Sequence, residues 1–148
     1  MNIHDLALKQ VDASLMQVRV PLRPQVGWIQ TIRTTLGMTA QQLAQRMGIS
    51  QATVSNLEKS EAAHTITLQS LQRAARALDC DVVYALLPRQ PLADMVEDKA
   101  AQLASASVLR VRHTMSLEAQ STPAGTAQQQ IAARKEALLA GRWSKLWN

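Results

Sequence analysis

The sequence of 148 residues contains no phenylalanine, one tyrosine and three tryptophans. Hydrophobic residues still make up 47% of the chain, so its apolar content comes mainly from Leu, Val, Ile, Ala and Met. These side chains fill helical proteins more often than sheet sandwiches, which makes an all-β fold improbable. The length suits about one domain, and this apolar content supports a core, so neither a disordered chain nor a mini-protein is expected.

Cysteine is scarce too. The single one, Cys80, cannot form an intramolecular disulfide. Its neighbours provide no metal-ligand spacing. Long apolar runs are missing as well: the most apolar run, residues 82–87, is far too short to cross a bilayer, and the first ten residues have no long apolar core. We therefore expect a soluble cytoplasmic protein with no membrane partner.

Catalytic patterns are equally absent from the sequence. We find no Ser-His-Asp set, no phosphate-binding glycine loop and no paired carboxylate site. His4, His64 and His113 are scattered, without carboxylate or thiol companions at ligand spacing. We therefore expect no enzyme activity, no metal and no cofactor. The net charge of +5 is compatible with a polyanionic partner but does not by itself identify one.

Apolar residues recur at helical spacing along the first third of the chain. Residues 3–18 predict a helix with one apolar stripe that must meet a partner. The stripe consists of Leu8, Val11, Leu15 and Val18. Two prolines and a glycine in residues 21–27 end this helix and form a connector, after which a second helix runs from Trp28 and stops at Gly37.

Polar capping residues mark the starts of the next three predicted helices. Thr39 has Gln42 three residues later, the spacing of a capping box. Ser50 is predicted to cap the next helix, and Thr67 is predicted to start a further amphipathic helix.

Residues 81–87 are β-prone and are followed by Pro88, which predicts one short strand. A lone strand leaves its backbone donors and acceptors unpaired. It therefore needs another strand in this chain or a copy from a second chain.

The remainder of the chain is predicted to be mainly helical. Residues 92–120 favour a helix, although the alternation in residues 108–112 permits a strand. Residues 121–125 form a linker, and Thr126 is predicted to cap a last helix. The expected division is an N-terminal helix and connector (1–24), a central domain of short helices (25–90) and a C-terminal helical extension (91–148).

The most informative segment runs from residue 39 to residue 58. Two short helices joined by a tight turn can cross steeply if a small residue lies at their contact and the turn accepts a positive φ. Ala44 and Gly48 meet these two requirements. The aliphatic residues that would pack the second helix against the first are Ile49, Val54 and Leu57.

The opposite face of the second helix is short, polar and uncharged, as expected of a face that reads base edges. Positions i, i+1, i+4 and i+5 lie together on a helix. Here they are Gln51, Ala52, Ser55 and Asn56.

This segment resembles the helix-turn-helix of the Cro/repressor (XRE) family, and the resemblance covers roughly residues 27–87. The resemblance implies an all-α, lambda-repressor-like domain, extended here by the N-terminal helix, the short strand and the C-terminal helices. It also implies a sequence-specific DNA-binding repressor. The alternative interpretation is an ordinary helical hairpin.

DNA contacts and a homodimer follow from this interpretation. An amide at Gln51 or Asn56 can read adenine bidentately, and Ala52 can contact a thymine methyl group. Phosphates would be bound at the starts of the two helices. The residues expected to contact phosphates are Thr39, Gln42, Arg46, Thr53 and Lys59. A homodimer is expected because one recognition helix reads too few base pairs.

Arg33 has two interpretations. It could contact a phosphate, but its match in Cro/repressor domains pairs inside the domain with the glutamate that matches Glu58. The resemblance therefore favours an internal ion pair.

A finer resemblance extends over most of the chain, to the "mobile mystery protein A" family. It rests on residues 6–12, 27–29, 36–38, 77–80 and 83–86. Members of that family are typically encoded beside a partner with a Fic domain, an enzyme that transfers nucleotides onto proteins. The resemblance implies an alternative role as an antitoxin or interaction protein that neutralises a Fic-domain toxin.

Two C-terminal features are candidates for partner binding. Trp143, Leu146 and Trp147 either fold back as core or form a docking peptide with aromatic anchors. Thr114 and Glu118 resemble the Ser/Thr-x-x-x-Glu-Gly/Asn motif of inhibitory helices of Fic enzymes, from which Ala119 departs. The competing interpretation of Glu118 is a solvated helix face.

Overall fold

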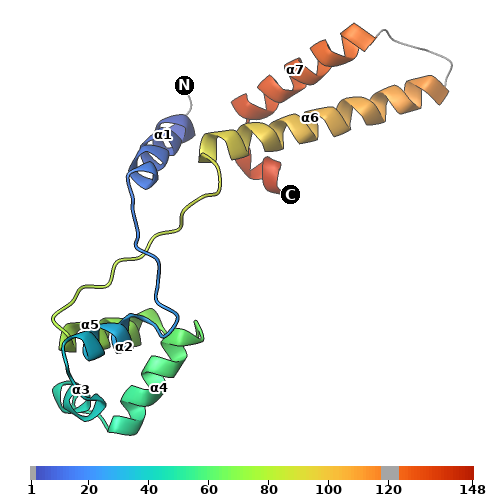
Figure 1. Ribbon diagram of the computed structural model, residues 1–148. Helices are drawn as coiled ribbons and strands as arrows, with labels where there is room; N and C mark the ends of the chain where they lie inside the picture. The colour runs from blue at the N-terminus through green and yellow to red at the C-terminus, as the bar shows by residue number, and fades with distance from the viewer. Residues whose placement is uncertain (1–2, 118–123) are drawn as a thin grey trace. The chain divides into compact units, whose positions relative to one another are not determined.

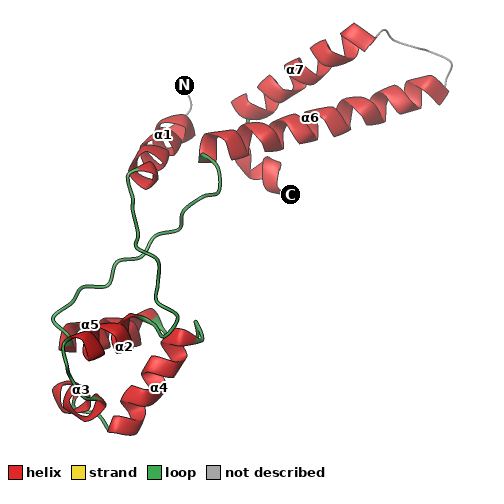
Figure 2. Cartoon of the chain, in the orientation of Figure 1, coloured by secondary structure: helices red, strands yellow, loops and turns green. Residues whose placement is uncertain are grey.

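The computed structural model describes residues 3–117 and 124–148, and this part of the chain is helical (Figures 1 and 2). The helices are α1 (Ile3–Met16), α2 (Trp28–Thr35), α3 (Ala40–Met47), α4 (Gln51–Ala62), α5 (Leu68–Ala77), α6 (Leu92–Leu117), α7 (Ala124–Ala140) and the 3-10 helix η1 (Trp143–Trp147). The expected helical fold class is confirmed. None of the helices in the described ranges is long and apolar enough to span a membrane.

The chain forms two compact units, and one of them is made of two separate stretches. Residues 19–85 form the first unit, with α2 to α5. The N-terminal stretch that ends at Val18 joins the stretch from Leu86 onward in the second unit. The predicted division into three consecutive segments does not anticipate this grouping, because it treats α1 as separate from the C-terminal helices.

The 19–85 unit is built around small and aliphatic side chains from all four of its helices. The buried cluster is Ile29, Leu43, Ala44, Val54, Ala74 and Leu78. The predicted caps Thr39 and Ser50 are confirmed, and Thr67, the predicted start of the next helix, is an N-cap as well. Each accepts a hydrogen bond from the backbone N–H three residues later. These caps satisfy helix donors that would otherwise lack partners, and they fix where α3, α4 and α5 begin.

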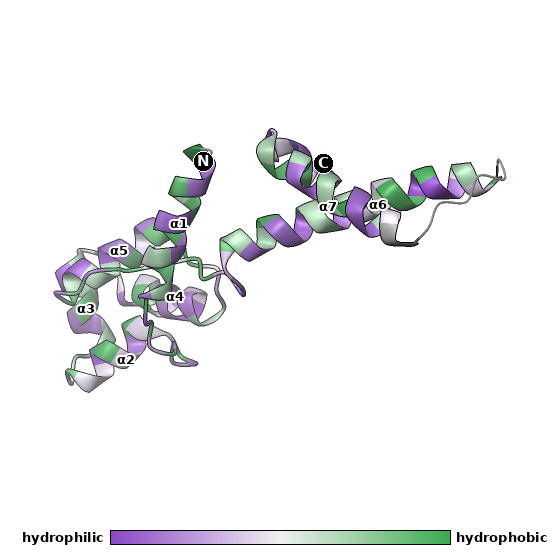
Figure 3. Cartoon of the chain, turned by 90° about the horizontal axis from the view of Figure 1, so that it is seen from above, coloured by the Kyte–Doolittle hydropathy of each residue, from purple (hydrophilic) through white to green (hydrophobic). Residues whose placement is uncertain are grey.

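In the second unit, α6 and α7 pack as a helical hairpin whose inner face on α6 repeats every fourth residue. The buried positions of α6 are Val96, Ala100, Ala104 and Val108. Leu146 of η1 is fully buried in the same unit, beside Val96 and Ala100. Both α1 and α6 carry hydrophobic residues interspersed with hydrophilic ones along their length (Figure 3). One face of α6 is buried, whereas α1 has no fully buried residue.

Helix α1 contacts α6, so the predicted partner for its apolar stripe lies within this chain. Leu8 packs against the cluster of Val96, Ala100 and Leu146. The carboxylate of Asp12 accepts hydrogen bonds from the backbone N–H groups of Leu92 (2.8 Å) and Ala93 (3.1 Å). It therefore caps α6 from 80 residues away in the sequence.

Three local predictions are corrected. Residues 81–87 form no strand, because no backbone hydrogen bond joins them to another segment in the described part of the chain. Residues 108–112 belong to helix α6, not to a strand. Thr126 lies within the first turn of α7 and does not precede it, since the helix begins at Ala124.

Candidate nucleic-acid interface

The turn between α3 and α4 has the conformation that its sequence requires. Gly48 ends α3 in the left-handed region, with φ 67° and ψ 34°. Just after it, the backbone N–H of Ile49 donates to the carbonyl of Ala44 over 3.0 Å. Since Ala44 is buried at the crossing of α3 and α4, its small side chain lets the two helices approach closely.

Helix α4 divides into a buried and an exposed face over its first two turns. Val54 is fully buried in the core of the unit. Gln51, Ala52 and Asn56 are exposed, and Ser55 is half-buried. The four residues predicted to read bases thus project from one helix, three of them into solvent, with no charged side chain among them.

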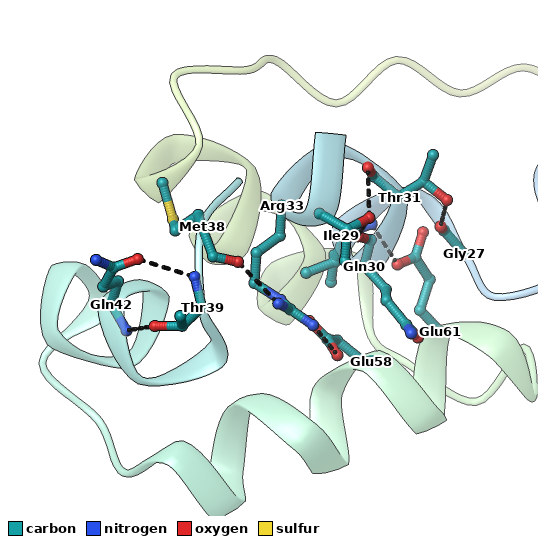
Figure 4. A network of polar contacts seen from close by, with 11 residues as sticks. Gly27, Ile29, Gln30, Thr31, Arg33, Met38, Thr39, Gln42, Glu58 and Glu61 are labelled. Carbon is teal, nitrogen blue, oxygen red and sulfur yellow. Dashed lines mark hydrogen bonds and ion pairs between the residues drawn. The ribbon is translucent and has the colours of Figure 1, made fainter. Parts of the chain in front are cut away.

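The residues predicted to contact phosphates lie at several different places. Thr39 and Gln42 form a complete capping box: Thr39 Oγ1 accepts from the Gln42 backbone N–H (3.1 Å) and Gln42 Oε1 accepts from that of Thr39 (2.9 Å) (Figure 4). Thr53 is exposed in the first turn of α4, and its hydroxyl is 2.7 Å from that of Ser50. Lys59 is exposed two turns further along α4.

Arg46 lies apart from the other predicted phosphate contacts, at the carboxyl end of α5. Its Nη1 donates to the carbonyl of Ala77 over 3.1 Å and lies 3.9 Å from a carboxylate oxygen of Asp79. These contacts compensate the carbonyl end of a helix, where a cation is favourable. Arg46 therefore joins α3 to α5 in this structure.

The internal pair implied for Arg33 is present. Arg33 Nε donates to Glu58 Oε1 over 2.6 Å and Nη2 donates to Oε2 over 3.2 Å, while Nη1 donates to the carbonyl of Met38 over 2.9 Å (Figure 4). Hydrogen bonding to Glu58 and its negative charge raise the pKa of the Arg33 guanidinium, against the opposing effect of burial. The bidentate pair ties α2 to α4 from inside the unit.

A second glutamate of α4, Glu61, was missed by the reasoning from sequence. Its two carboxylate oxygens accept from the backbone N–H groups of Trp28 (2.7 Å) and Ile29 (2.9 Å), at the start of α2 (Figure 4). Glu61 is only 4% exposed. Glu61 thus caps α2 from a distant helix, a role for which no local spacing rule exists.

Gly27 makes room for this carboxylate. Its φ is 86°, and a Cβ added to it would lie 2.7 Å from Glu61 Cδ and Oε2. A glycine followed by an aromatic helix start is a weak signal by itself, so the close approach could not be read from the sequence.

Arg23 of the connector binds the same carboxyl end of α4. Its Nη1 donates to the carbonyl of Glu61 over 3.1 Å, and its Nη2 lies 2.7 Å from His64 Nε2. The connector before α2 is therefore fastened to the carboxyl end of α4, which holds that end of the helix in place.

The candidate partner residues lie in the other unit. Trp143 is half-buried, stacks on His4 with ring centroids 5.5 Å apart, and donates through Nε1 to the carbonyl of Leu139 over 2.8 Å. With Leu146 fully buried, this end of the chain folds back as core, while Trp147 is 55% exposed. Glu118 lies outside the described residues.

Comparison with known proteins supports a helix-turn-helix in the 19–85 unit. Residues 29–84 match a family model described as helix-turn-helix. This match supports the resemblance to Cro/repressor-type regulators and a DNA-binding role, and it does not reach the C-terminal helices. No curated protein and no solved structure matches the chain.

Proposed function

We propose that this protein is a sequence-specific DNA-binding repressor that regulates its own operon. The observation that carries the proposal is the uncharged polar face of α4, whose first two turns expose Gln51, Ala52 and Asn56. That face lies directly after a tight turn and on a helix whose opposite side is buried. Such a helix fits the major groove, where base edges present distinct donor and acceptor patterns.

The rigidity of α4 supports this function. Glu58 and Glu61 fasten its inner side to α2, and Arg23 binds its carboxyl end. Discrimination between bases requires side chains on a well-placed backbone, because a bidentate amide contact tolerates little displacement. The contacts that hold α4 therefore serve its reading face.

Phosphate contacts would position the helix without specifying a sequence. Backbone N–H groups at the starts of α3 and α4, together with Thr53 and Lys59, are the groups we assign to them. Arg46 can contribute only by leaving the carboxyl end of α5. We therefore rank it last among the phosphate contacts.

The repressor acts as a homodimer in this proposal. One recognition helix contacts only a few base pairs, and two-fold operators match two-fold proteins. Two copies that place α4 on one face of the duplex require half-sites about 10 base pairs apart.

The test is selection of bound sequences from random duplex DNA, followed by measurements on the selected operator at a stated salt concentration. Gln51→Ala should weaken binding by about 1–3 kcal/mol and relax the preference at one position. Lys59→Ala should weaken binding to every sequence alike and reduce the salt slope by about one. Gln102→Ala, the same change at an exposed position of α6, is the matched control. Affinity for all sequences that is unaffected by Gln51→Ala would refute the assignment.

A second role, neutralisation of a Fic-domain toxin encoded beside this protein, is favoured by the second unit. Helices α1, α6, α7 and η1 have their own buried cluster, which reading DNA does not require. Ordering these residues costs conformational entropy, so they are expected to serve a function of their own. Exposed Trp147 is the aromatic anchor we assign to such a partner, while the hydrogen bond from Trp143 to Leu139 joins η1 to α7. A variant with Gln51→Ala and Asn56→Ala that loses operator binding but still neutralises the toxin would separate the two roles.

A further inference from the structure

Residues 81–87 lie in the loop between α5 and α6 and form neither helix nor strand, and all of them except Asp81 are apolar (Figure 2). Val83 is 83% exposed, Leu86 is 85% exposed, and Tyr84 and Leu87 are also exposed. No main-chain hydrogen bond joins residues 81–87 to any residue in the ranges 3–117 and 124–148. A β-prone segment with both backbone edges free is a template for pairing with another strand.

We propose that this segment pairs antiparallel with the same segment of a second copy of the chain, with Ala85 on the two-fold axis. The inference rests on the homodimer proposed above and assigns its interface. In the single chain the segment is not a strand, and it becomes one only through the second copy.

The sequence of the segment is complementary to itself in this register. With Ala85 opposite Ala85, each Tyr84 faces Leu86 of the second copy and each Val83 faces Leu87. At the two ends, Asp81 of one copy faces Arg89 of the other. Opposite charges and apolar side chains placed directly across an antiparallel pair are both stabilising.

Proline at position 88 selects which pairs carry the hydrogen bonds. In an antiparallel pair, hydrogen-bonded and non-hydrogen-bonded pairs alternate. If the Ala85 pair is hydrogen-bonded, the pairs formed by residues 83 and 87 are hydrogen-bonded as well. Pro88 then lies in a non-hydrogen-bonded pair, and its nitrogen points away from the second copy. Pro88 then interrupts no ladder hydrogen bond. The opposite choice would direct its nitrogen, which has no hydrogen, at the second copy.

A groove beside the segment supplies the further apolar surface that such a pair needs, since an isolated two-stranded ribbon is at best marginally stable in water. Its volume is about 630 Å³, and it is lined by Leu86 and Leu87 together with Leu15, Leu92 and Met95. Leu86 and Leu87 belong to both the segment and the groove, so the groove adjoins the end of the segment that lies in the second unit.

A charge exchange tests the register in the full chain. Asp81→Arg or Arg89→Asp alone places like charges opposite each other twice in the dimer, and should raise the dimer dissociation constant about tenfold in sedimentation equilibrium. The variant that carries both changes should restore it. Leu86→Ser should also weaken the dimer, whereas Leu22→Ser, at a position 95% exposed in the connector before α2, should not.

A cross-link tests the position of the axis. In a background with Cys80→Ala, Ala85→Cys should form an intermolecular disulfide on oxidation, because hydrogen-bonded partners have Cα atoms about 5.5 Å apart. Val83→Cys should not, because the two residues 83 lie on opposite sides of the axis.

The outcomes separate this interface from the proposed function. A dimer that resists both single charge reversals, or that cross-links through residue 83 and not residue 85, overturns the interface while leaving DNA reading by α4 intact. A chain that is monomeric at micromolar concentration overturns the pairing with a second copy. The segment would then be free to pair with a strand of another protein. Loss of base preference in the operator assay is measured independently and bears on α4 alone.

Discussion

Replacing Glu58 by Gln should destabilise the 19–85 unit by about 2–3 kcal/mol. The pair with Arg33 is bidentate, and its side chains are only 12% and 10% exposed. Removing one partner of a buried pair leaves an uncompensated charge and costs about 3–5 kcal/mol. The amide oxygen of Gln can still accept one N–H of Arg33, so the expected loss is somewhat below this range. The neighbouring bond from Arg33 to the carbonyl of Met38 is retained.

Urea unfolding of the full chain, followed by the indole N–H signals of its tryptophans, measures this loss. Trp28 reports on α2, and Trp143 reports on the second unit. The matched control is Glu97→Gln, whose pair with Lys135 spans 3.3 Å with side chains 63% and 32% exposed, so a loss below about 1 kcal/mol is expected at Trp143. If Glu58→Gln costs no more than this control, the pair does not hold α2 to α4.

Two further predictions concern helix starts that are capped from a distance. Gly27→Ala should lower the free energy of unfolding by roughly 2 kcal/mol or more, since it combines a positive φ with displacement of the Glu61 carboxylate. Gly37→Ala also has a positive φ but meets nothing within 4 Å, so an equal loss there would contradict this reasoning. Asp12→Asn should lower the free energy of unfolding by about 1 kcal/mol and speed hydrogen exchange at the amides of Leu92 and Ala93. Unchanged exchange would show that the Asp12 charge does not stabilise the start of α6.

Features governed by local chemistry could be predicted from the sequence. The capping box at Thr39 and the caps at Ser50 and Thr67 depend on residues three apart. The turn glycine, Gly48, depends on one backbone conformation. Since these signals are short in range, they fix the starts of α3, α4 and α5 and the turn that precedes the exposed polar face of α4.

Features that join distant residues could not be predicted in the same way. Glu61 caps α2 across 33 residues and Asp12 caps α6 across 80. Neither carboxylate differs in its local sequence from an ordinary solvated one. The Arg33 pair was anticipated only through the resemblance to Cro/repressor domains, since spacing alone does not distinguish it from a phosphate contact.

The strand expected at residues 81–87 was wrong for the single chain for a related reason. Local β propensity reports how a side chain fits a pleated surface, and it cannot supply a neighbouring strand. Without one, the backbone stays solvated and the segment forms no strand. The same propensity is meaningful only if the partner comes from outside the chain.

The order of the units along the chain decides which deletions are informative. Because α1 belongs with α6 and α7, the 19–85 unit is inserted between two stretches of the other unit. A truncation after Pro88 would therefore remove α6, against which Leu8 of α1 packs. It would also remove the backbone amides that Asp12 caps. Its loss of function could reflect aggregation through that apolar stripe. Removing residues 1–18 together with everything after Arg89 avoids this problem, since every contact described for Arg23, Arg33 and Glu61 lies within the chain that remains. This shorter chain also keeps residues 81–89, so it can separate the strand pairing from any contribution of the second unit to the dimer.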